Sequence, residues 1–140
     1  MIYLDTNIIV YAIENHPTYG KKCKRILENI QKNKTNAGCS TLVLVELINV
    51  LKKINRELEK KGTKALDIKK NIDAVLSLPI TWFDMGLIVI KRASEYDYKI
   101  SGIDYIHVAT MELNSISEVM SADKELDRVP ILTRLDPLKT

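Results

Sequence analysis

The stretch that decides the fold is Ile2-Tyr3-Leu4-Asp5-Thr6-Asn7-Ile8-Ile9-Val10-Tyr11-Ala12-Ile13. Its first three residues are apolar and prefer β structure, as in a buried parallel strand. Three polar residues of the types favoured in turns and helix N-caps then interrupt the apolar run, which resumes at once. The stretch therefore predicts a strand that ends at a carboxylate, followed by a short helix. Because ligands bind at the carboxyl ends of strands in open α/β sheets, Asp5 is the first candidate site residue.

The rest of the chain alternates short β-prone runs with amphipathic helical patterns. Further strands are predicted at Ala37–Cys39, Ile80–Phe83, Val119–Ser121 and Ile131–Thr133. Helices are predicted around Cys23–Ile30, from residue 41 past Leu51, and over Ala65–Leu76, Gly86–Tyr98 and Ile103–Leu113. In the helix 86–98, the spacing places Leu87, Ile90, Ala93 and Tyr96 inward. The alternation predicts a three-layer α/β fold, with a mostly parallel five-stranded sheet and helices on both faces.

Length and composition set the broad class of the protein. A chain of 140 residues with 46% hydrophobic and 28% charged residues is typical of one soluble globular domain, so residues 1–140 are expected to fold together. We expect no signal peptide and no membrane span, because the longest apolar run, Leu42–Leu51, is too short to cross a bilayer. The expected location is the cytoplasm. Cys23 and Cys39 match no zinc spacing and are expected to be reduced.

The basic residues are concentrated in one predicted helical arm. Residues 56–70 contain six basic and three acidic residues, a difference of +3 that equals the net charge of the whole chain. The basic residues are Arg56, Lys60, Lys61, Lys64, Lys69 and Lys70. Such a stretch can contact a phosphate backbone, and the alternative is an ordinary solvated helix face.

Four acidic residues occupy the positions where a site is expected. Asp5 and Asp123 follow predicted strands, and Asp104 lies at a predicted helix start, where each could equally serve as a helix cap. Glu46 lies within a strongly apolar helix, where an unpaired carboxylate has a high desolvation cost. In a parallel sheet these positions gather at one edge. Carboxylates brought together repel one another, and a divalent cation removes that repulsion. Oxygen ligands alone favour Mg²⁺ or Mn²⁺ over zinc.

Four short motifs around these acids give the sequence a family resemblance. They are Leu4-Asp5-Thr6-Asn7, Leu44-Val45-Glu46-Leu47, Ile103-Asp104-Tyr105-Ile106-His107-Val108-Ala109 and Ser121-Ala122-Asp123-Lys124-Glu125-Leu126-Asp127. In this order and spacing the chain resembles the PIN-domain ribonucleases, and among them the VapC-type toxins of toxin–antitoxin pairs. One departure is Leu126, where the family often has phenylalanine, and this changes packing only.

The resemblance implies an activity, a site and partners. The activity is metal-dependent hydrolysis of RNA phosphodiester bonds, with Asp5, Glu46, Asp104 and Asp123 as catalytic metal ligands for Mg²⁺ or Mn²⁺. Thr6, Ser121 and Asp127 have a supporting role, although the acid at Asp127 occurs in only some family members. The implied partners are an RNA substrate, a small antitoxin protein and a second copy of the chain. Candidate dimer surfaces are the apolar faces of residues 42–51 and 23–30.

Other functions are compatible with the same motifs. One is a housekeeping RNA-processing nuclease, and another is a non-catalytic RNA- or protein-binding module of the same fold. A phosphotransfer or receiver domain is less favoured, since such folds tend to place two acids after the first strand, where this chain has Asp5 alone. His107, three residues after Asp104, is interpreted as structural.

Overall fold

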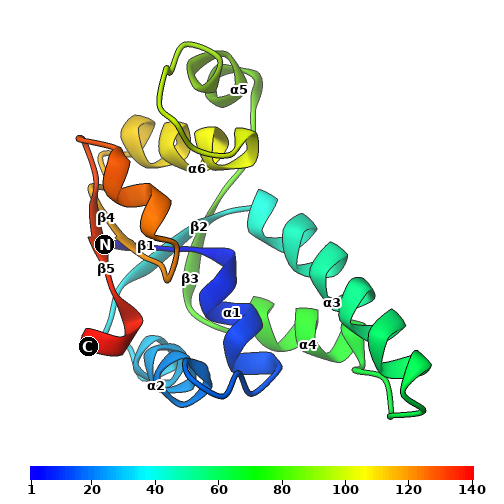
Figure 1. Cartoon of the computed structure of the whole chain (residues 1–140). Coiled ribbons are helices and arrows are strands. Elements are labelled where there is room, and N and C mark those ends of the chain that lie inside the picture. Colours follow the sequence, from blue (N-terminus) through cyan, green and yellow to red (C-terminus); the bar gives the residue numbers. More distant parts are fainter.

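A computed structural model describes residues 1–140, and its centre is a five-stranded sheet in which every neighbouring pair of strands is parallel (Figure 1). The strands are β1 (Ile2–Leu4), β2 (Ala37–Ser40), β3 (Ile80–Phe83), β4 (Glu118–Met120) and β5 (Thr133–Leu135). Their order across the sheet is β3-β2-β1-β4-β5. The predicted parallel sheet with helices on both faces is confirmed.

Side chains of β1 alternate between the two faces of the sheet, as strand geometry requires. Leu4 joins the larger hydrophobic core, which packs against α1 (Thr6–Ile13), α2 (Gly20–Gln31), α3 (Leu42–Lys60) and α4 (Ile68–Leu76). Tyr3 points to the opposite face and packs with Met111 of α6 (Gly102–Leu113). The short helix α5 (Leu87–Ala93) packs against α6 on that side (Figure 1). The sheet is therefore the middle of three layers.

The predicted helical arm is present and consists of the outer part of α3, the following loop and α4 (Figure 1). Helix α3 ends before Gly62, which has a φ of 66°, the left-handed conformation that commonly terminates helices. The Asn55 side chain of α3 binds the loop that leads to α4: it accepts from the Leu66 amide at 2.8 Å and donates to the Leu66 carbonyl at 3.0 Å. These two bonds attach the loop of residues 61–67, which contains Lys61 and Lys64, to α3.

The prediction of a helix over residues 86–98 is wrong in length and in part of its buried face, since Ala93 is buried as predicted but Leu87 and Ile90 are not. Helix α5 ends at Ala93, where the Ser94 hydroxyl donates to the Lys91 carbonyl and competes with continued helical bonding. Its buried residues are Val89 and Ala93, one turn apart, which pack against Ala109 of α6. Leu87 is 84% exposed and Ile90 is 43% exposed, so neither points inward.

Two further expectations are corrected by the structure. The last strand begins at Thr133, two residues later than predicted, because Val129 to Leu132 form a turn closed by a bond from the Leu132 amide to the Val129 carbonyl. The apolar faces of residues 23–30 and 42–51 are also largely used within the chain itself. Their buried residues are Cys23, Ile26, Ile30, Val43, Leu47 and Leu51, all of which belong to the larger core. Most of the apolar residues on these faces are therefore unavailable to a second copy of the chain, although Val45 is 52% exposed.

Both cysteines are buried free thiols, as predicted. None of the helices combines the length and the apolar character that crossing a bilayer would require.

Candidate metal centre

The four predicted acids meet in one cavity at the carboxyl ends of the strands. Strand β1 lies between β2 and β4: the chain adds β2 and β3 on one side of β1 and then crosses to add β4 and β5 on the other. Such a reversal of strand order opens a binding crevice at the carboxyl ends of the strands in α/β folds. The cavity has a volume of about 350 Å³. It is lined by Asp5, Glu46, Asp104 and Asp123 together with Thr6, Asn7, Val10, Tyr11, Val50 and Ser101. The predicted convergence is observed, and the role of these acids as metal ligands stays a prediction.

Asp5 is buried at the base of this cavity, with 9% of its surface exposed. It caps α1 by accepting from the Thr6 amide at 2.7 Å, and it accepts from the Ser121 hydroxyl at 2.5 Å and the Asn7 side-chain amide at 3.1 Å. Burial raises the pKa of Asp5, although the charge of His107 and these hydrogen bonds oppose the rise. Capping and membership of the acid cluster therefore coexist in one residue.

Glu46 projects from the first half of α3 into the same cavity. Its Oε1 atom accepts from the Thr6 hydroxyl at 3.0 Å and lies 2.5 Å from His107 Nε2. The apolar helix tolerates this glutamate because one side of its carboxylate contacts the histidine and the other faces the cavity.

His107 is held from behind by Tyr3, whose hydroxyl oxygen lies 2.5 Å from His107 Nδ1 and also accepts from the Ser40 amide at 3.1 Å. Burial lowers the pKa of His107, but the hydrogen bond to Glu46 and the charges of Asp5, Glu46 and Asp104 together raise it above its usual value. Burial also raises the pKa of Tyr3 well above its usual value. A protonated His107 fixes the orientation of Glu46, so its structural role includes positioning an acid of the cluster.

Asp104 and Asp123 face each other at the mouth of the cavity. One carboxylate oxygen from each of Asp104, Asp123 and Glu125 lies within 4.8 Å of the other two. Asp104 accepts from the Ser101 hydroxyl at 2.9 Å, and burial raises its pKa to about 6, with added repulsion from Asp5 and Asp123. Asp123 caps the short 3₁₀ helix η1 (Lys124–Arg128) by accepting from the Glu125 amide at 2.9 Å.

Of the three predicted supporting residues, two lie in the acid cluster and one lies outside it. Thr6 and Ser121 lie in the cluster, where each hydroxyl donates to an acid, Glu46 and Asp5 respectively. Asp127 instead forms a two-bond ion pair with Arg134, at 2.9 and 3.2 Å, and does not line the cavity. Its only link to the cluster is indirect, because Arg134 also donates to the Ser121 carbonyl at 2.9 Å.

Sequence reasoning missed Asn7 and Glu125 as parts of the site. The Asn7 side chain donates to Asp5 and to the Ser121 hydroxyl, and it accepts from the Ala122 amide at 3.3 Å, so it joins α1 to the segment after β4. Its place in the Asp5-Thr6-Asn7 run was the available signal. Glu125 lies beside Asp104 and Asp123 because it is in the first turn of η1. No feature of the sequence pattern singled it out.

The donor set fits a hard divalent cation. All of the cluster's acidic groups offer carboxylate oxygens, the ligands that Mg²⁺ and Mn²⁺ prefer. The pKa values of Asp5 and Asp104 are raised mainly by burial, with a smaller contribution from repulsion by neighbouring acids, and a bound cation would offset both effects. Asp5, Glu46, Asp104 and Asp123 are the residues that would hold such an ion, with Glu125 in reach at the mouth.

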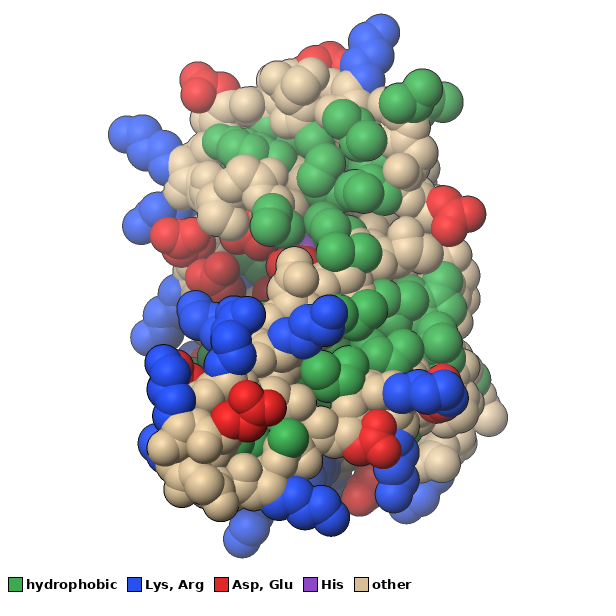
Figure 2. Space-filling model, turned by 90° about the vertical axis from the view of Figure 1, so that its right-hand side faces the viewer, with side chains coloured by type: hydrophobic (Ala, Val, Ile, Leu, Met, Phe, Trp, Pro, Cys, Tyr) green, Lys and Arg blue, Asp and Glu red, His purple; other side chains and the backbone are tan.

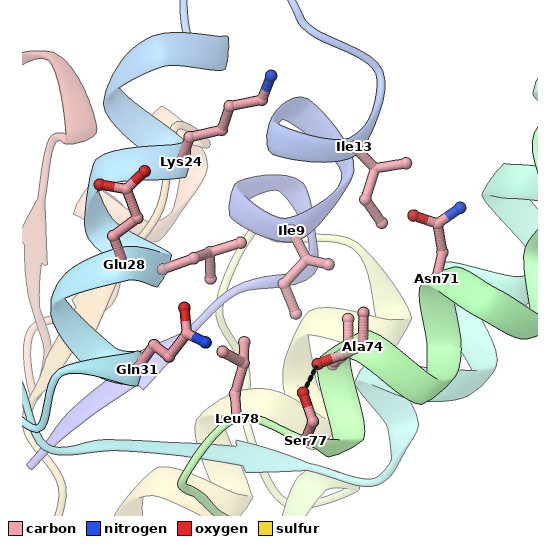
Figure 3. A pocket seen from close by; sticks show the side chains of 11 residues that line it. Ile9, Ile13, Lys24, Glu28, Gln31, Asn71, Ala74, Ser77 and Leu78 are labelled. Carbon is pink, nitrogen blue, oxygen red and sulfur yellow. Dashed lines mark hydrogen bonds between the residues drawn. The ribbon is translucent and has the colours of Figure 1, made fainter.

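A second cavity of about 300 Å³ lies on the far side of α1, between α1, α2 and α4 (Figure 3). Ile9 and Ile13 of α1, with Leu27, Val75 and Leu78, give it an apolar floor. Polar side chains surround this floor, namely Lys24, Glu28, Gln31, Asn71 and Ser77. We call this cavity the α1–α2–α4 groove.

Comparison with known proteins places the fold. The sequence model of the PIN domain matches residues 2–132. The chain belongs to the PIN domain family. No curated protein sequence matches this PIN domain significantly.

Solved structures similar to this PIN domain come from several bacteria. VapBC2 from Rickettsia felis, solved bound to a DNA fragment from their promoter, matches with a TM-score of 0.69 and 24% identity, over 96% of this chain and 98% of that chain. VapC20 from Mycobacterium tuberculosis, a sarcin-ricin loop cleaving toxin, matches with a TM-score of 0.71 and 17% identity, over 93% and 95%. FitAcB from Neisseria gonorrhoeae matches with a TM-score of 0.58 and 16% identity, over 98% of each chain. At these identities the likeness concerns the fold.

Proposed function

We propose that this PIN domain is a metal-dependent endoribonuclease and the toxin of a type II toxin–antitoxin pair. One observation carries the nuclease proposal: Asp5, Glu46, Asp104 and Asp123 come from four separate segments and line a single cavity. Gathering these carboxylates costs stability, and a cation-dependent reaction gives a reason to retain them.

A bound Mg²⁺ or Mn²⁺ would supply activation of a water molecule and neutralisation of charge on the phosphate. The residues of the chain prepare the site. Ser121 and Asn7 hold the buried carboxylate of Asp5, while Thr6 and His107 hold Glu46. Asp104 is held by Ser101 at the mouth of the cavity, and a bound cation would lower its pKa from the value of about 6 that burial gives it in the metal-free chain.

The test of this proposal is the variant Asp5→Asn, because asparagine caps a helix nearly as well as aspartate. Cleavage of a structured RNA in Mn²⁺ should fall by about a hundred-fold or more, since a charged ligand is lost. In chelator, the variant should be as stable as the parent or about 1 kcal/mol more stable, because one repelling charge is gone. Added Mn²⁺ should raise the melting temperature of the parent chain much more than that of the variant.

An Asp5→Asn variant that cleaves at the parental rate would overturn the site assignment. Cleavage by the parent chain that persists in excess chelator would overturn the metal dependence instead. A fully folded parent chain that neither binds nor cleaves RNA with metal would favour the non-catalytic module.

We further propose a small antitoxin as the partner of this chain, as in the VapBC complexes that share the fold. The α1–α2–α4 groove suits one face of an amphipathic helix, since its floor is apolar and its rim is polar. Helix α1 separates this groove from the acidic cavity, so a tail extending past the groove could place a basic residue among the acids. Such a residue would take the place of the metal.

Filling the groove tests this partner. Ala74 is exposed and lines the groove, so Ala74→Trp should reduce co-purification of the protein encoded by the neighbouring gene and relieve its inhibition of cleavage. The matched control is Ala65→Trp, an equally exposed alanine in the arm loop. If the neighbouring gene product neither binds nor inhibits the parent chain, the housekeeping nuclease replaces the toxin as the proposed function.

We also propose a homodimer formed through hydrophobic side chains on the α3 and α5 side of the molecule. Figure 2 shows such side chains over much of this face, next to the acidic side chains. The exposed ones include Val45, Met85, Leu87, Ile88, Ile90 and Ile103. Large exposed apolar patches are typical of interaction surfaces.

A further inference from the structure

The first half of α2 carries basic charge that no acidic residue neutralises. Lys21, Lys22, Lys24 and Arg25 lie within five consecutive positions, and none of the ion pairs in the structure includes them. Lys22 is occupied by the Thr140 carbonyl at 3.0 Å. Lys21 is exposed and takes part in no ion pair, so its charge is available to a ligand.

Lys21 and Lys24 line a small cavity at the turn between α1 and α2. Its volume is about 280 Å³, and the other residues around it are Asn15, His16, Pro17 and Gly20. The Lys24 ammonium donates to the Asn15 side-chain oxygen and is therefore directed toward this turn. A cavity with two lysines and no carboxylate suits an anion.

Three aromatic rings connect this basic cavity to the acidic one. Tyr11 stacks on Tyr19 with ring centroids 5.1 Å apart, and His16 lies 4.5 Å from Tyr11 and 5.2 Å from Tyr19. Tyr11 lines the acidic cavity, and His16 lines the basic one. All three rings are partly exposed. The three rings therefore lie between the acidic cavity and the two lysines, with Glu14 as an acidic residue near Tyr11.

The distribution of charge on this surface indicates what it could bind. The acidic cavity repels a polyanion, so an RNA substrate needs nearby cations to approach it. Proteins that bind single strands combine basic grooves for the phosphates with aromatic side chains on which bases stack. The α1–α2 turn has both parts within two short segments.

We propose that the α1–α2 turn is a binding subsite for the single-stranded RNA that flanks the cleaved bond, with a phosphate at Lys21 and Lys24 and a base stacked at Tyr19 and His16. This inference rests on the proposed ribonuclease function. It adds a second contact region outside the acidic cavity and a direction in which the strand leaves that cavity.

The experiment measures binding of a labelled single-stranded RNA of about twelve nucleotides, in chelator so that no cleavage occurs. The variant is Lys21→Gln with Lys24→Gln, and the matched control is Lys32→Gln with Lys34→Gln at the opposite end of α2. The first pair should lower the affinity about ten-fold at ~0.1 M salt and reduce the slope of log K against log salt by about 0.7, the value for one phosphate contact on a single strand. The control pair should leave both quantities near the parental values.

A second arm tests the stacking. Tyr19→Ala should weaken binding of the normal RNA but not of an abasic strand of the same length, whereas Tyr19→Phe should bind both as the parent does. The lysine variant should weaken both strands equally. A merely structural role for Tyr19 would weaken both strands in the alanine variant, and thermal melts identify any variant that has not folded.

Equal RNA affinity of the lysine variant and its control overturns the subsite. So does a loss confined to antitoxin binding, because the turn would then be a protein-binding surface. A duplex RNA bound better than the single strand also overturns the proposal. Failure of the parent chain to cleave any RNA is a different result, since it removes the proposed function itself.

Discussion

Asp104 illustrates how bringing acids together in a buried site lowers the free energy of unfolding. Burial, with repulsion from Asp5 and Asp123, raises its pKa from the usual 3.8 to about 6. The folded chain then binds a proton that the unfolded chain has released, between pH ~4 and ~6, so the free energy of unfolding decreases as pH rises through this window. Above about pH 6 the whole penalty is present, and below about pH 4 it is absent.

Asp104→Asn should remove this penalty. In chelator at pH 7.5 we expect the variant to be about 1 kcal/mol more stable than the parent, a value reduced from the full shift because the group is partly solvated. At pH 4 the difference should vanish. Urea unfolding at several pH values measures this, with Asp136→Asn as a control acid outside the cavity. A stability difference independent of pH would contradict the assigned pKa.

Residue identity and spacing sufficed to predict the members of the site that follow strands or begin helices. Asp5, Asp104 and Asp123 could be predicted because parallel strands bring their carboxyl ends to one edge. Asp127 illustrates the limit: it lies only four residues after Asp123, yet it pairs with Arg134 of β5. That contact depends on how the last strand docks, which local pattern does not encode.

At the scale of elements, the arm formed by α3 and α4 keeps its basic charge exposed. Lys60 pairs with Glu57 and Lys69 with Asp73, whereas Lys61 and Lys64 have no acidic partner. Lys61→Glu with Lys64→Glu should weaken RNA binding several-fold and flatten its salt dependence. The control is Lys32→Glu with Lys34→Glu, an equal charge change elsewhere. Unchanged RNA affinity would leave the arm as a solvated surface or an antitoxin contact.

The helices and strands were predictable where the hydrophobic periodicity was strong and where a residue such as proline marked the end of an element. Strand β3 matches its prediction at both ends, because Pro79 precedes it and β-prone residues fill it. Helix α5 was misjudged because Leu87, Ile88, Val89 and Ile90 are consecutive apolar residues, which allow more than one helical face to be buried. Only packing on α6 selects Val89 and Ala93.

At the scale of the whole molecule, the exposed side chains of Leu87 and Ile88 lead to a prediction about dimer formation. Leu87 and Ile88 are 84% and 75% exposed, so replacing both with aspartate costs the monomer little packing. We expect the parent chain to be a dimer at micromolar concentration by light scattering, and the Leu87→Asp, Ile88→Asp variant to be a monomer with an unchanged melting profile at high dilution. Leu138→Asp, on the other side of the chain, is the control. A monomeric parent chain would end this proposal.

The sheet order has a consequence for how the chain emerges during synthesis. Strand β1 pairs on one side with β2, about 35 residues later, and on its other side with β4, which begins at residue 118. Ser121 and Asp123 follow β4 directly, and Asp104 precedes it by a single helix. A ribosome must therefore release the chain from β1 to beyond Asp123 before the acids can meet. Nascent chains that end before Asp104 carry Asp5 and Glu46 without their counterparts, so the complete cluster forms only after β4 has emerged.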